Sequence, residues 1–466
     1  MLKSLTSDIR IRRATPHYPF VRARTPLKFG AVVVEALDFC HVCVEVENRA
    51  GKVAQGWGAM FLMDMWAWPS AAVPHEQRMV AMRRLNGDLC KLFASYDDYA
   101  HPVDIFHRLE SGMRRAAEQV SRELKLAEQI PYLATLVCTS PIDGAVHDAF
   151  GNVNRMDTYH GYGRDFMTSD LSTYLGKTYA GAYVGDFVRK KLPARVPAFH
   201  LVGGLDKLHE KEITDGDPHD GLPVSLDQWI RHDHLHCLKV KIRGTDLEWD
   251  LARIREVSAI AHEEHKKLGL KELFFSGDTN EQCKSPDYCI ELLTNLRESD
   301  PRTYGELLYL EQPTERDLHA HRFDMRPLAK LKPVIMDESL MTNEDFDLAM
   351  ELGWSGIALK ACKCQSAALV FGCKAERLKI PYTVQDLTNP GIALIQSVSL
   401  AGHLHTLKGV EANSRQFFPV ASVAEAHVHP GVFKLKDGCI ETASIRGTGL
   451  GYRWDEIGRK FDESAK

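Results

Sequence analysis

Between about residue 195 and residue 410 the sequence alternates short apolar runs with amphipathic helical patterns, and this alternation restricts the possible folds more than any other feature. The run 236–242 is typical of a strand, and Thr245 with Glu248 forms a capping box at the start of the next helix. A helical stretch is also expected near 317–331. Strands that alternate with helices form parallel βα units, and a series this long favours a closed barrel over an open sheet.

The rest of the chain lacks this alternation. Apolar alternation in the first sixty residues predicts strands, and the spacing of Met79, Met82 and Leu85 predicts helices over 73–150. The expected fold class is therefore α/β, a barrel with an added α+β domain. The expected segments are an α+β domain (1–155), a connecting or insertion segment (156–194), a TIM-type βα barrel (195–424) and a C-terminal segment that returns to the N-terminal domain (425–466).

Composition excludes several classes of protein. The 466 residues carry a net charge of -5, whereas a general binder of nucleic acid or anionic membranes would show a basic excess. No apolar run approaches the roughly 20 residues needed to span a bilayer. The eleven cysteines lack the regular spacing of a disulfide framework, and the N-terminus has no apolar signal region. We therefore expect a reduced, cytoplasmic protein without nucleic-acid or membrane partners.

Charged residues follow the ends of consecutive predicted strands, and in a barrel these positions converge on one mouth. Asp278, Glu311 and Asp337 follow the third, fourth and fifth barrel strands. Three carboxylates this close cannot all remain ionised without a cation. Ligand sets made only of oxygen atoms favour Mg²⁺ over zinc. The sequence therefore predicts a magnesium site at the barrel mouth.

Lysines flank these carboxylates on both sides. Lys239 and Lys241 end the second barrel strand, and Lys360 ends the sixth. Clustering and partial desolvation are expected to lower the pKa of these lysines, so that a neutral amine can act as a base near pH 7. The chemistry that suits this set is removal of a proton next to a carboxylate, with Mg²⁺ stabilising the enediolate that forms.

The order of these motifs resembles the enolase superfamily, in its mandelate racemase/muconate lactonizing family. The motifs are Lys-Val-Lys, Gly-Asp-Thr-Asn, Leu-Glu-Gln-Pro, Asp-Glu-Ser and Ala-Leu-Lys in the barrel, with Gly56-Trp-Gly58, Ala145-x-x-Asp148-x-x-Gly151 and Gly449-Leu-Gly451 outside it. The resemblance implies a (β/α)7β barrel with a capping domain formed by the N-terminal part and the C-terminal tail. A lysine on the sixth strand, and no histidine at the end of the seventh, indicate the muconate lactonizing subgroup.

The resemblance implies roles for individual residues. Asp278, Glu311 and Asp337 would be the Mg²⁺ ligands, and Lys241 and Lys360 would be the acid/base pair on opposite faces of the substrate. Residues implied to support the ligands are Asn280, Gln312 and Glu338.

Other residues are expected to contact the substrate or to stabilise it. Lys239 would give electrostatic support, and Glu411 with Asn413 on the eighth strand could hold a cationic or amide nitrogen. In the family, two loops of the capping domain close over the mouth. Arg24 in the first loop could meet a second anionic group, and Trp66 in the second could form part of an apolar wall.

Bases on both faces favour a racemase or epimerase, with an amino acid derivative or a dipeptide as the candidate substrate. A cycloisomerase or a dehydratase of acid sugars or hydroxy acids, working through the same intermediate, is the alternative. A Schiff-base aldolase, which would need one buried lysine and no carboxylate triad, and a non-catalytic scaffold are the remaining hypotheses. The resemblance also implies a small-molecule carboxylate substrate and a homo-oligomer.

Overall fold

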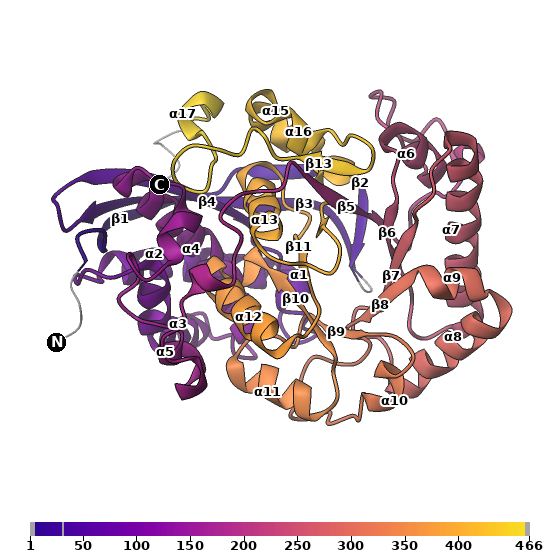
Figure 1. Cartoon of the computed structure of the whole chain (residues 1–466), viewed down its shortest axis with the longest axis horizontal. Helices are drawn as coiled ribbons and strands as arrows, with labels where there is room; N and C mark the ends of the chain where they lie inside the picture. Colours follow the sequence, from indigo (N-terminus) through magenta and orange to yellow (C-terminus); the bar gives the residue numbers. More distant parts are fainter. Residues whose placement is uncertain (1–4, 30–31, 462–466) are drawn as a thin grey trace.

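The computed structural model describes residues 5–29 and 32–461. The chain begins with an antiparallel sheet in which β3 lies between β1 and β2 and also pairs with β4 (Figure 1). The strands are β1 (Ile9–His17), β2 (Phe20–Phe29), β3 (Val32–Asn48) and β4 (Val53–Phe61). The helices that follow are α1 (Asp64–Ala67), α2 (His75–Ala94), α3 (Pro102–Glu123) and α4 (Tyr132–Asn154).

Helix α4 packs directly on the backbone of β4. A Cβ atom added to Gly56 would lie 2.1 Å from the backbone nitrogen of Ala149, and one added to Gly58 would lie 2.1 Å from the carbonyl oxygen of Pro141. Any side chain at either glycine would therefore force the helix away from the sheet. The Gly-Trp-Gly motif is thus explained by close packing of the capping domain.

Residues 156–194 form short helical turns between the capping domain and the barrel. These are η1 (Thr158–Tyr162), α5 (Ser172–Leu175), η2 (Lys177–Tyr179) and η3 (Val184–Asp186). The Tyr162 hydroxyl lies 2.8 Å from Nδ1 of His147 on α4. The amide of Gln365, on a barrel helix, donates a hydrogen bond to the Tyr159 hydroxyl. The segment therefore links the two domains through buried hydrogen bonds.

Eight parallel strands of the described chain form a closed barrel, because β12 pairs with β5 as well as with β11. The strands are β5 (Arg195–Val202), β6 (Cys237–Lys241), β7 (Phe274–Asp278), β8 (Leu307–Glu311), β9 (Val334–Met336), β10 (Gly356–Lys360), β11 (Tyr382–Gln385) and β12 (Val410–Glu411). The predicted fold class, a modified TIM barrel with an α+β cap, is confirmed.

Helices connect these strands around the outside of the barrel. They are η4 (Glu210–Glu212), α6 (Leu226–Asp233), α7 (Leu247–Leu268), α8 (Pro286–Ser299), α9 (Pro301–Glu306), α10 (Arg326–Ala329), α11 (Asn343–Glu351), η5 (Ala361–Lys363), α12 (Gln365–Leu378) and α13 (Gly391–His403). Among the described residues, no helix combines the length and the apolar character that crossing a bilayer requires.

The helix predicted near 317–331 is wrong, because only the single turn α10 forms there. The Asp317 side chain accepts hydrogen bonds from the backbone N–H groups of His319 and Ala320. This local side-chain turn satisfies the backbone without a helix, and it therefore competes with helix formation.

The C-terminal segment contacts both domains. Strand β13 (Cys439–Glu441) pairs antiparallel with β5 of the barrel, whereas a Cβ added to Gly449 would lie 2.1 Å from Oδ1 of Asp148 on the capping helix α4. The segment runs along the top of Figure 1. Between the barrel and this segment lie α14 (Ser414–Phe417) and η6 (Pro419–Ser422), and the helices that follow are α15 (Val423–Val428), α16 (Pro430–Phe433) and α17 (Trp454–Ile457).

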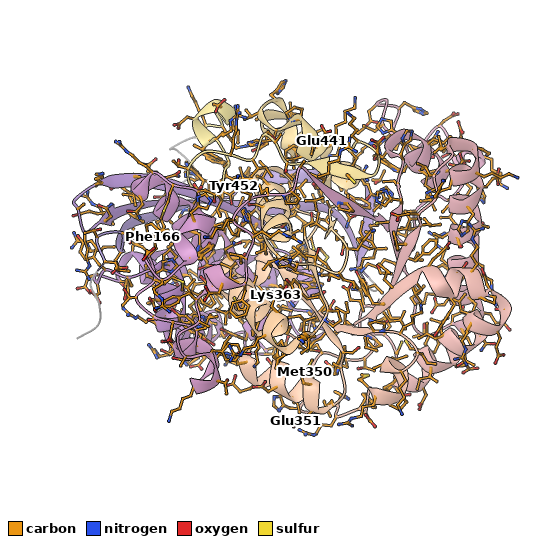
Figure 2. The ribbon with its side chains drawn as sticks, in the orientation of Figure 1. Phe166, Met350, Glu351, Lys363, Glu441 and Tyr452 are labelled. Carbon is orange, nitrogen blue, oxygen red and sulfur yellow. The ribbon has the colours of Figure 1, made fainter. Side chains whose placement is uncertain are left out.

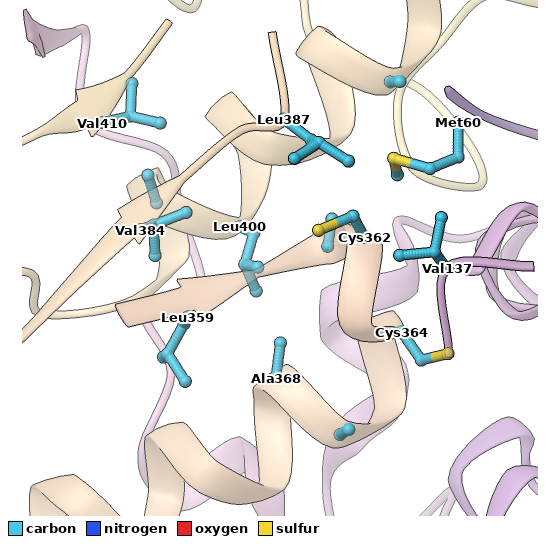
Figure 3. Packing of buried hydrophobic residues seen from close by; sticks show 14 of the residues in the cluster. Met60, Val137, Leu359, Cys362, Cys364, Ala368, Val384, Leu387, Leu400 and Val410 are labelled. Carbon is cyan, nitrogen blue, oxygen red and sulfur yellow. The ribbon is translucent and has the colours of Figure 1, made fainter. Parts of the chain in front are cut away.

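One hydrophobic core extends from the capping domain into the barrel. Figure 3 shows Met60 of β4 and Val137 of α4 beside Cys362 and Cys364, which follow β10. All four side chains are buried. Because apolar packing continues across the boundary, the capping domain is held rigidly over one end of the barrel.

Candidate active site

The three predicted carboxylates lie side by side at the end of the barrel that faces the capping domain. Strand register places Lys241 opposite Asp278, and Asp278 opposite Glu311. Asp337 follows directly after β9, the next strand. Each of the three carboxylates is 1% exposed. The barrel register thus brings together groups that are about thirty residues apart along the chain.

Lysine ammonium groups pair with all three carboxylates. Lys239 Nζ lies 2.8 Å from Glu311 Oε1 and 3.0 Å from Asp278 Oδ2. Lys241 forms an ion pair with the same Asp278 oxygen. On the other flank, Lys360 Nζ lies 2.8 Å from Asp337 Oδ2. The two lysines of the predicted acid/base pair therefore lie at opposite ends of the carboxylate row.

A fourth lysine joins the cluster, and the sequence analysis did not identify it. Lys363 Nζ lies 3.1 Å from Asp337 Oδ1, and the side chain is buried. Figure 2 shows Lys363 where the capping domain meets the barrel. The residue lies three positions after Lys360 in the turn η5. That spacing was the available signal, because one turn of helix returns a side chain to the same side.

The cluster contains more negative than positive groups. Six buried carboxylates surround the four lysines, so full ionisation would leave two negative charges unmatched. They are Asp278, Glu311, Asp337, Glu338, Asp386 and Glu411. Carboxylate oxygens with an excess of two negative charges fit a hard divalent cation such as Mg²⁺ in kind and in charge.

The carboxylates do not converge on a single point as they stand. Among the residues that the structure describes, no three His, Cys, Asp or Glu side chains are arranged to hold a metal ion. The reason is Lys239, whose ammonium lies between Asp278 and Glu311 and also 2.8 Å from Glu411 Oε2. A positive charge is thus already stabilised between two of the predicted ligands.

Burial and charge shift the pKa values of these carboxylates in opposite directions. Burial raises the pKa of Glu311 to about 8, and the neighbouring Asp278 and Asp337 add to the rise against the pull of Lys239. Burial also opposes ionisation of Asp278, but Lys239 and Lys241 outweigh it and lower the pKa of that carboxyl. Glu311 therefore favours its protonated form, whereas Asp278 favours its ionised form.

The expectation of a lowered lysine pKa is wrong for Lys360. Burial alone would lower the pKa of Lys360, but Asp337, with Glu311 and Glu411 further away, outweighs burial and raises the pKa above its usual value. The pKa of Lys239 is raised for the same reason, by Asp278, Glu311 and Glu411. The carboxylates therefore keep both lysines protonated near neutral pH.

Two of the three residues predicted to support the ligands, Asn280 and Gln312, make direct hydrogen bonds to them. Glu338 instead accepts from the Trp66 indole and the Asn280 amide. The backbone N–H of Asn280 donates to Asp278 Oδ1 at 2.8 Å, and the Asn280 side-chain oxygen accepts from Lys241. The Gln312 side-chain oxygen accepts from the backbone N–H of Asp337 at 2.8 Å. Both Asn280 and Gln312 have positive φ values, of 45° and 34°. The left-handed conformation turns the backbone sharply after β7 and after β8, at the mouth of the barrel.

Glu411 and Asn413 already have protein partners. Glu411 Oε1 accepts from the Asn413 amide, and Glu411 Oε2 accepts from Lys239. The Asn413 oxygen accepts from the backbone N–H of Leu201. Each side-chain oxygen of the two residues therefore already accepts a hydrogen bond from the protein.

Arg24 is not brought to the carboxylate cluster. Its guanidinium pairs with Asp220, 2.6 Å away, and donates to the carbonyl oxygens of Leu222 and Pro223. The side chain is 7% exposed. The predicted role of Arg24 in binding a substrate anion therefore has no support here, and the residue instead fastens β2 to the loop before α6.

Trp66, just after β4, covers the lysines on the Asp337 side. Its ring centre lies 4.9 Å from Lys360 Nζ and 5.7 Å from Lys363 Nζ. Its indole N–H donates to Glu338 Oε1 at 2.9 Å. A cavity of about 640 Å³ reaches this point, lined by Trp66, Asn280 and Glu338 among other residues. The predicted capping wall thus includes an aromatic ring that contacts the candidate base.

Two further residues at the site, Gln385 and Asp386, were not predicted from the sequence. The Gln385 amide donates to Glu311 Oε2, and Asp386 is buried near Lys360 and Glu411. Gln385 is the last residue of the seventh barrel strand, β11, and Asp386 follows it directly. Burial and the nearby Glu411 raise the pKa of Asp386 well above its ordinary value.

The structure combines a closed barrel and a capping domain with a row of carboxylates between lysines at the mouth. This combination is typical of a class of barrel enzymes. Residues 224–457 match the family described as enolase C-terminal domain-like. The chain belongs to the enolase superfamily, in its mandelate racemase/muconate lactonizing family. No curated protein sequence matches the chain.

Solved structures share the fold at low sequence identity. The N-succinyl Arg/Lys racemase from Bacillus cereus ATCC 14579 is 15% identical with a TM-score of 0.60, over 96% of this chain and 97% of that one. The dipeptide epimerase from Enterococcus faecalis V583, complexed with Mg and L-Leu-L-Tyr, is 14% identical with a TM-score of 0.59, over 95% and 99%. The muconate lactonizing enzyme from Pseudomonas fluorescens is 16% identical with a TM-score of 0.57, over 98% of each chain.

Proposed function

We propose that the protein is an isomerase that removes the proton next to a substrate carboxylate and forms an enediolate, and that it acts as a racemase or epimerase. The observation that supports this most is the position of Lys241 and Lys360 at the two ends of one buried carboxylate row. A substrate held over that row would have one amine on each side. Two such amines can remove a proton from one face and return it to the other.

Lys241 and Lys360 differ in burial and in the groups that they contact. Lys360 is buried, contacts Trp66 and pairs with Asp337, so its ammonium is poised as the acid. Lys241 is 12% exposed at its side chain and borders the loop that carries Asn280, so it lies nearer to water than Lys360 does. In one direction Lys241 would accept the α-proton while Lys360 donates. In the reverse direction Lys360 would be the base, which would require that Mg²⁺ on Asp337 weaken the attraction that raises the pKa of Lys360.

Asp278, Glu311 and Asp337 would hold Mg²⁺, and Asn280 and Gln312 would orient these ligands through the hydrogen bonds described above. When bound, the cation would neutralise the carboxylates and stabilise the negative charge that develops on the substrate carboxylate. With the cation held by Asp278 and Glu311, Glu411 would remain the carboxylate that pairs with Lys239. The role of Lys239 in this proposal is to balance the charge of the eighth strand.

The first substrates to test are amino acid derivatives and dipeptides. This choice rests on the racemase and epimerases among the solved structures with this fold. A cycloisomerase is the second candidate, because muconate lactonizing enzymes share the fold equally well. A dehydratase would use the same proton abstraction, followed by loss of a leaving group from the neighbouring carbon.

The test is proton NMR in D₂O with Mg²⁺ and pools of N-acylamino acids, dipeptides, hydroxy acids and acid sugars. Loss of the α-proton signal that stops when EDTA is added would support proton abstraction with a divalent cation. Without α-proton exchange, a new lactone would favour the cycloisomerase and a new keto acid would favour the dehydratase. Activity that persists in EDTA, and that borohydride traps on a lysine, would instead favour a Schiff-base aldolase. No reaction together with no Mg²⁺ binding would favour a non-catalytic scaffold.

We also propose a reducing compartment, the cytoplasm, as the location. All eleven cysteines are free thiols, and nine of them are buried. Assembly into a homo-oligomer stays a prediction, which size-exclusion chromatography with light scattering would test.

A further inference from the structure

A second cavity, of about 540 Å³, lies where three parts of the chain meet. Helix α3 of the capping domain forms one side, the connecting segment around 169–174 forms another, and residues 341–344 with helix α12 close the barrel side. None of the lining residues belongs to the candidate active site. A volume of this size suits a small organic molecule.

Asp104, near the start of α3, carries the strongest sign of a missing partner in this cavity. The residue is 2% exposed, and its Oδ1 accepts a hydrogen bond from the Tyr174 hydroxyl at 2.6 Å. Its Oδ2 is buried and has no hydrogen-bond partner among the described residues. A buried carboxylate oxygen without a donor is costly, so this oxygen calls for one from a ligand.

His107 lies one helical turn further along α3 and lines the same cavity. Its ring stacks on the Tyr174 ring at a centroid distance of 4.5 Å. Burial lowers the pKa of His107 to about 4, so the ring is neutral at pH 7. Its Nε2 is also buried without a hydrogen-bond partner in the described part of the chain. A neutral imidazole nitrogen can accept a hydrogen bond from the same ligand.

The charges that line the cavity favour a cationic ligand. Glu344 adds one carboxylate to that of Asp104, and Glu110 also lines the cavity but forms an ion pair with Arg114 at 3.1 Å. The lining contains one cation, Arg108, whose guanidinium donates to the Tyr96 hydroxyl at 2.6 Å, outside the lining, and lies 3.7 Å from Asp98. Negative charge therefore remains in excess inside the cavity, and an ammonium group would be attracted to it.

The rest of the lining is partly polar, with Ser169, Thr173, Thr342 and Asn343, and partly apolar, with a large aromatic share. The apolar and aromatic residues include Phe106, Tyr132, Tyr174, Met341, Val370 and Phe371. Aromatic faces bind apolar groups and also attract cations. A ligand that combines an ammonium group with a flat apolar body would therefore match both parts of the lining.

We propose that this cavity binds a small arylalkyl amine, with its ammonium group on Asp104 Oδ2 and its apolar body against the aromatic walls. The proposal is independent of the reaction at the barrel mouth. It also gives the connecting segment 156–194 a role. The segment supplies Tyr174, which lines the cavity and donates to Asp104.

The test is isothermal titration calorimetry on the full chain with three probes of the same shape: 2-phenylethylamine, 2-phenylethanol and phenylacetate. The amine is expected to bind, the alcohol to bind at least about tenfold more weakly, and the acid not to bind. Equal binding of amine and alcohol, or no binding of the amine, would overturn the proposal.

Variants then locate the site. Asp104→Asn keeps an oxygen for the Tyr174 hydroxyl but removes the charge, and it should weaken amine binding at least about tenfold. Glu118→Gln, on an exposed position of the same helix, is the matched control and should bind as the wild type. If Asp104→Asn does not fold, Ala367→Leu narrows the cavity from the barrel side and should also remove binding. Unchanged binding in a folded Asp104→Asn or Ala367→Leu protein would contradict the assignment.

Discussion

The Asp148 carboxylate accepts a hydrogen bond of 2.8 Å from the backbone N–H of Leu450, which lies 302 residues further along the chain. The other oxygen of Asp148 accepts from the backbone N–H of Trp57 at 3.0 Å. One buried side chain of α4 thus joins β4 to the C-terminal segment. The three motifs outside the barrel that carry the family resemblance meet at this residue, so they maintain the capping domain and do not take part in the chemistry.

Replacing Asp148 with Asn should destabilise the protein by about 1–3 kcal/mol, because Asn presents N–H groups to one of the two backbone donors. Burial raises the pKa of Asp148 to about 7 from 3.8. The folded state therefore holds a proton that the unfolded state loses, so this residue's contribution to stability is full below about pH 4 and is lost as the pH rises to about 7. The difference in Tm between wild type and variant should shrink over that range. A constant difference would contradict the raised pKa.

Gly56→Ala should be among the most damaging single-methyl changes in the chain, costing more than about 3 kcal/mol, because the new Cβ would lie 2.1 Å from the Ala149 backbone. Gly87→Ala is the matched control. Gly87 lies inside α2 with nothing within 4 Å of an added Cβ, so the same change should stabilise by about 0.5–1 kcal/mol. Denaturant unfolding measures both, and similar values for the two would contradict the close packing of α4 on β4.

Lys241→Ala and Lys360→Ala should each slow α-proton exchange by about 10²- to 10⁴-fold, and each should affect one enantiomer of the substrate first. The reason is that the two amines lie at opposite ends of the carboxylate row. Proton NMR in D₂O with each enantiomer separately measures this. Lys330→Ala is the control, because it lies on a barrel loop away from the cluster. If both variants exchange both enantiomers at wild-type rates, these lysines are not the bases.

Glu311→Gln should weaken Mg²⁺ binding at least about 100-fold, because the change removes a charged oxygen from the centre of the predicted ligand set. Calorimetric titration with Mg²⁺ measures the affinity without any substrate. Glu315→Gln, four residues further along and only partly buried, is the matched control and should bind Mg²⁺ as the wild type does. Equal affinity in the two variants would remove Glu311 from the ligand set.

Trp66→Phe should lower kcat/KM roughly tenfold through loss of the hydrogen bond to Glu338, while the ring stays over Lys360. Trp68→Phe is the comparison. The Trp68 indole N–H donates to Glu128 at 2.6 Å, so the same kind of bond is lost in the same cavity without touching the lysines. An equal loss of activity in both variants would show that Trp66 acts only by filling space.

The positions of Asp278 and Glu311 could be predicted because strand ends are visible as apolar runs, and a closed barrel gathers such ends at one mouth. Lys363 was missed because it lies in a turn after β10, and a turn has no hydrophobic periodicity that would predict it. Its spacing of three residues from Lys360 is the signal that places it beside Asp337. Arg24 was assigned to the substrate because the sequence cannot show that Asp220, 196 residues away, takes its charge.

The sequence by itself determined that a barrel forms, which strand ends make its mouth, and which residues stand there. These features depend on local periodicity and on the regular spacing of βα units. Only the tertiary structure decided how those charges are paired. Lys239 lies among Asp278, Glu311 and Glu411, which come from three other strands. Pairing of this kind depends on distances across the barrel, and the energy of a buried charge depends on every group around it, so no local pattern encodes it.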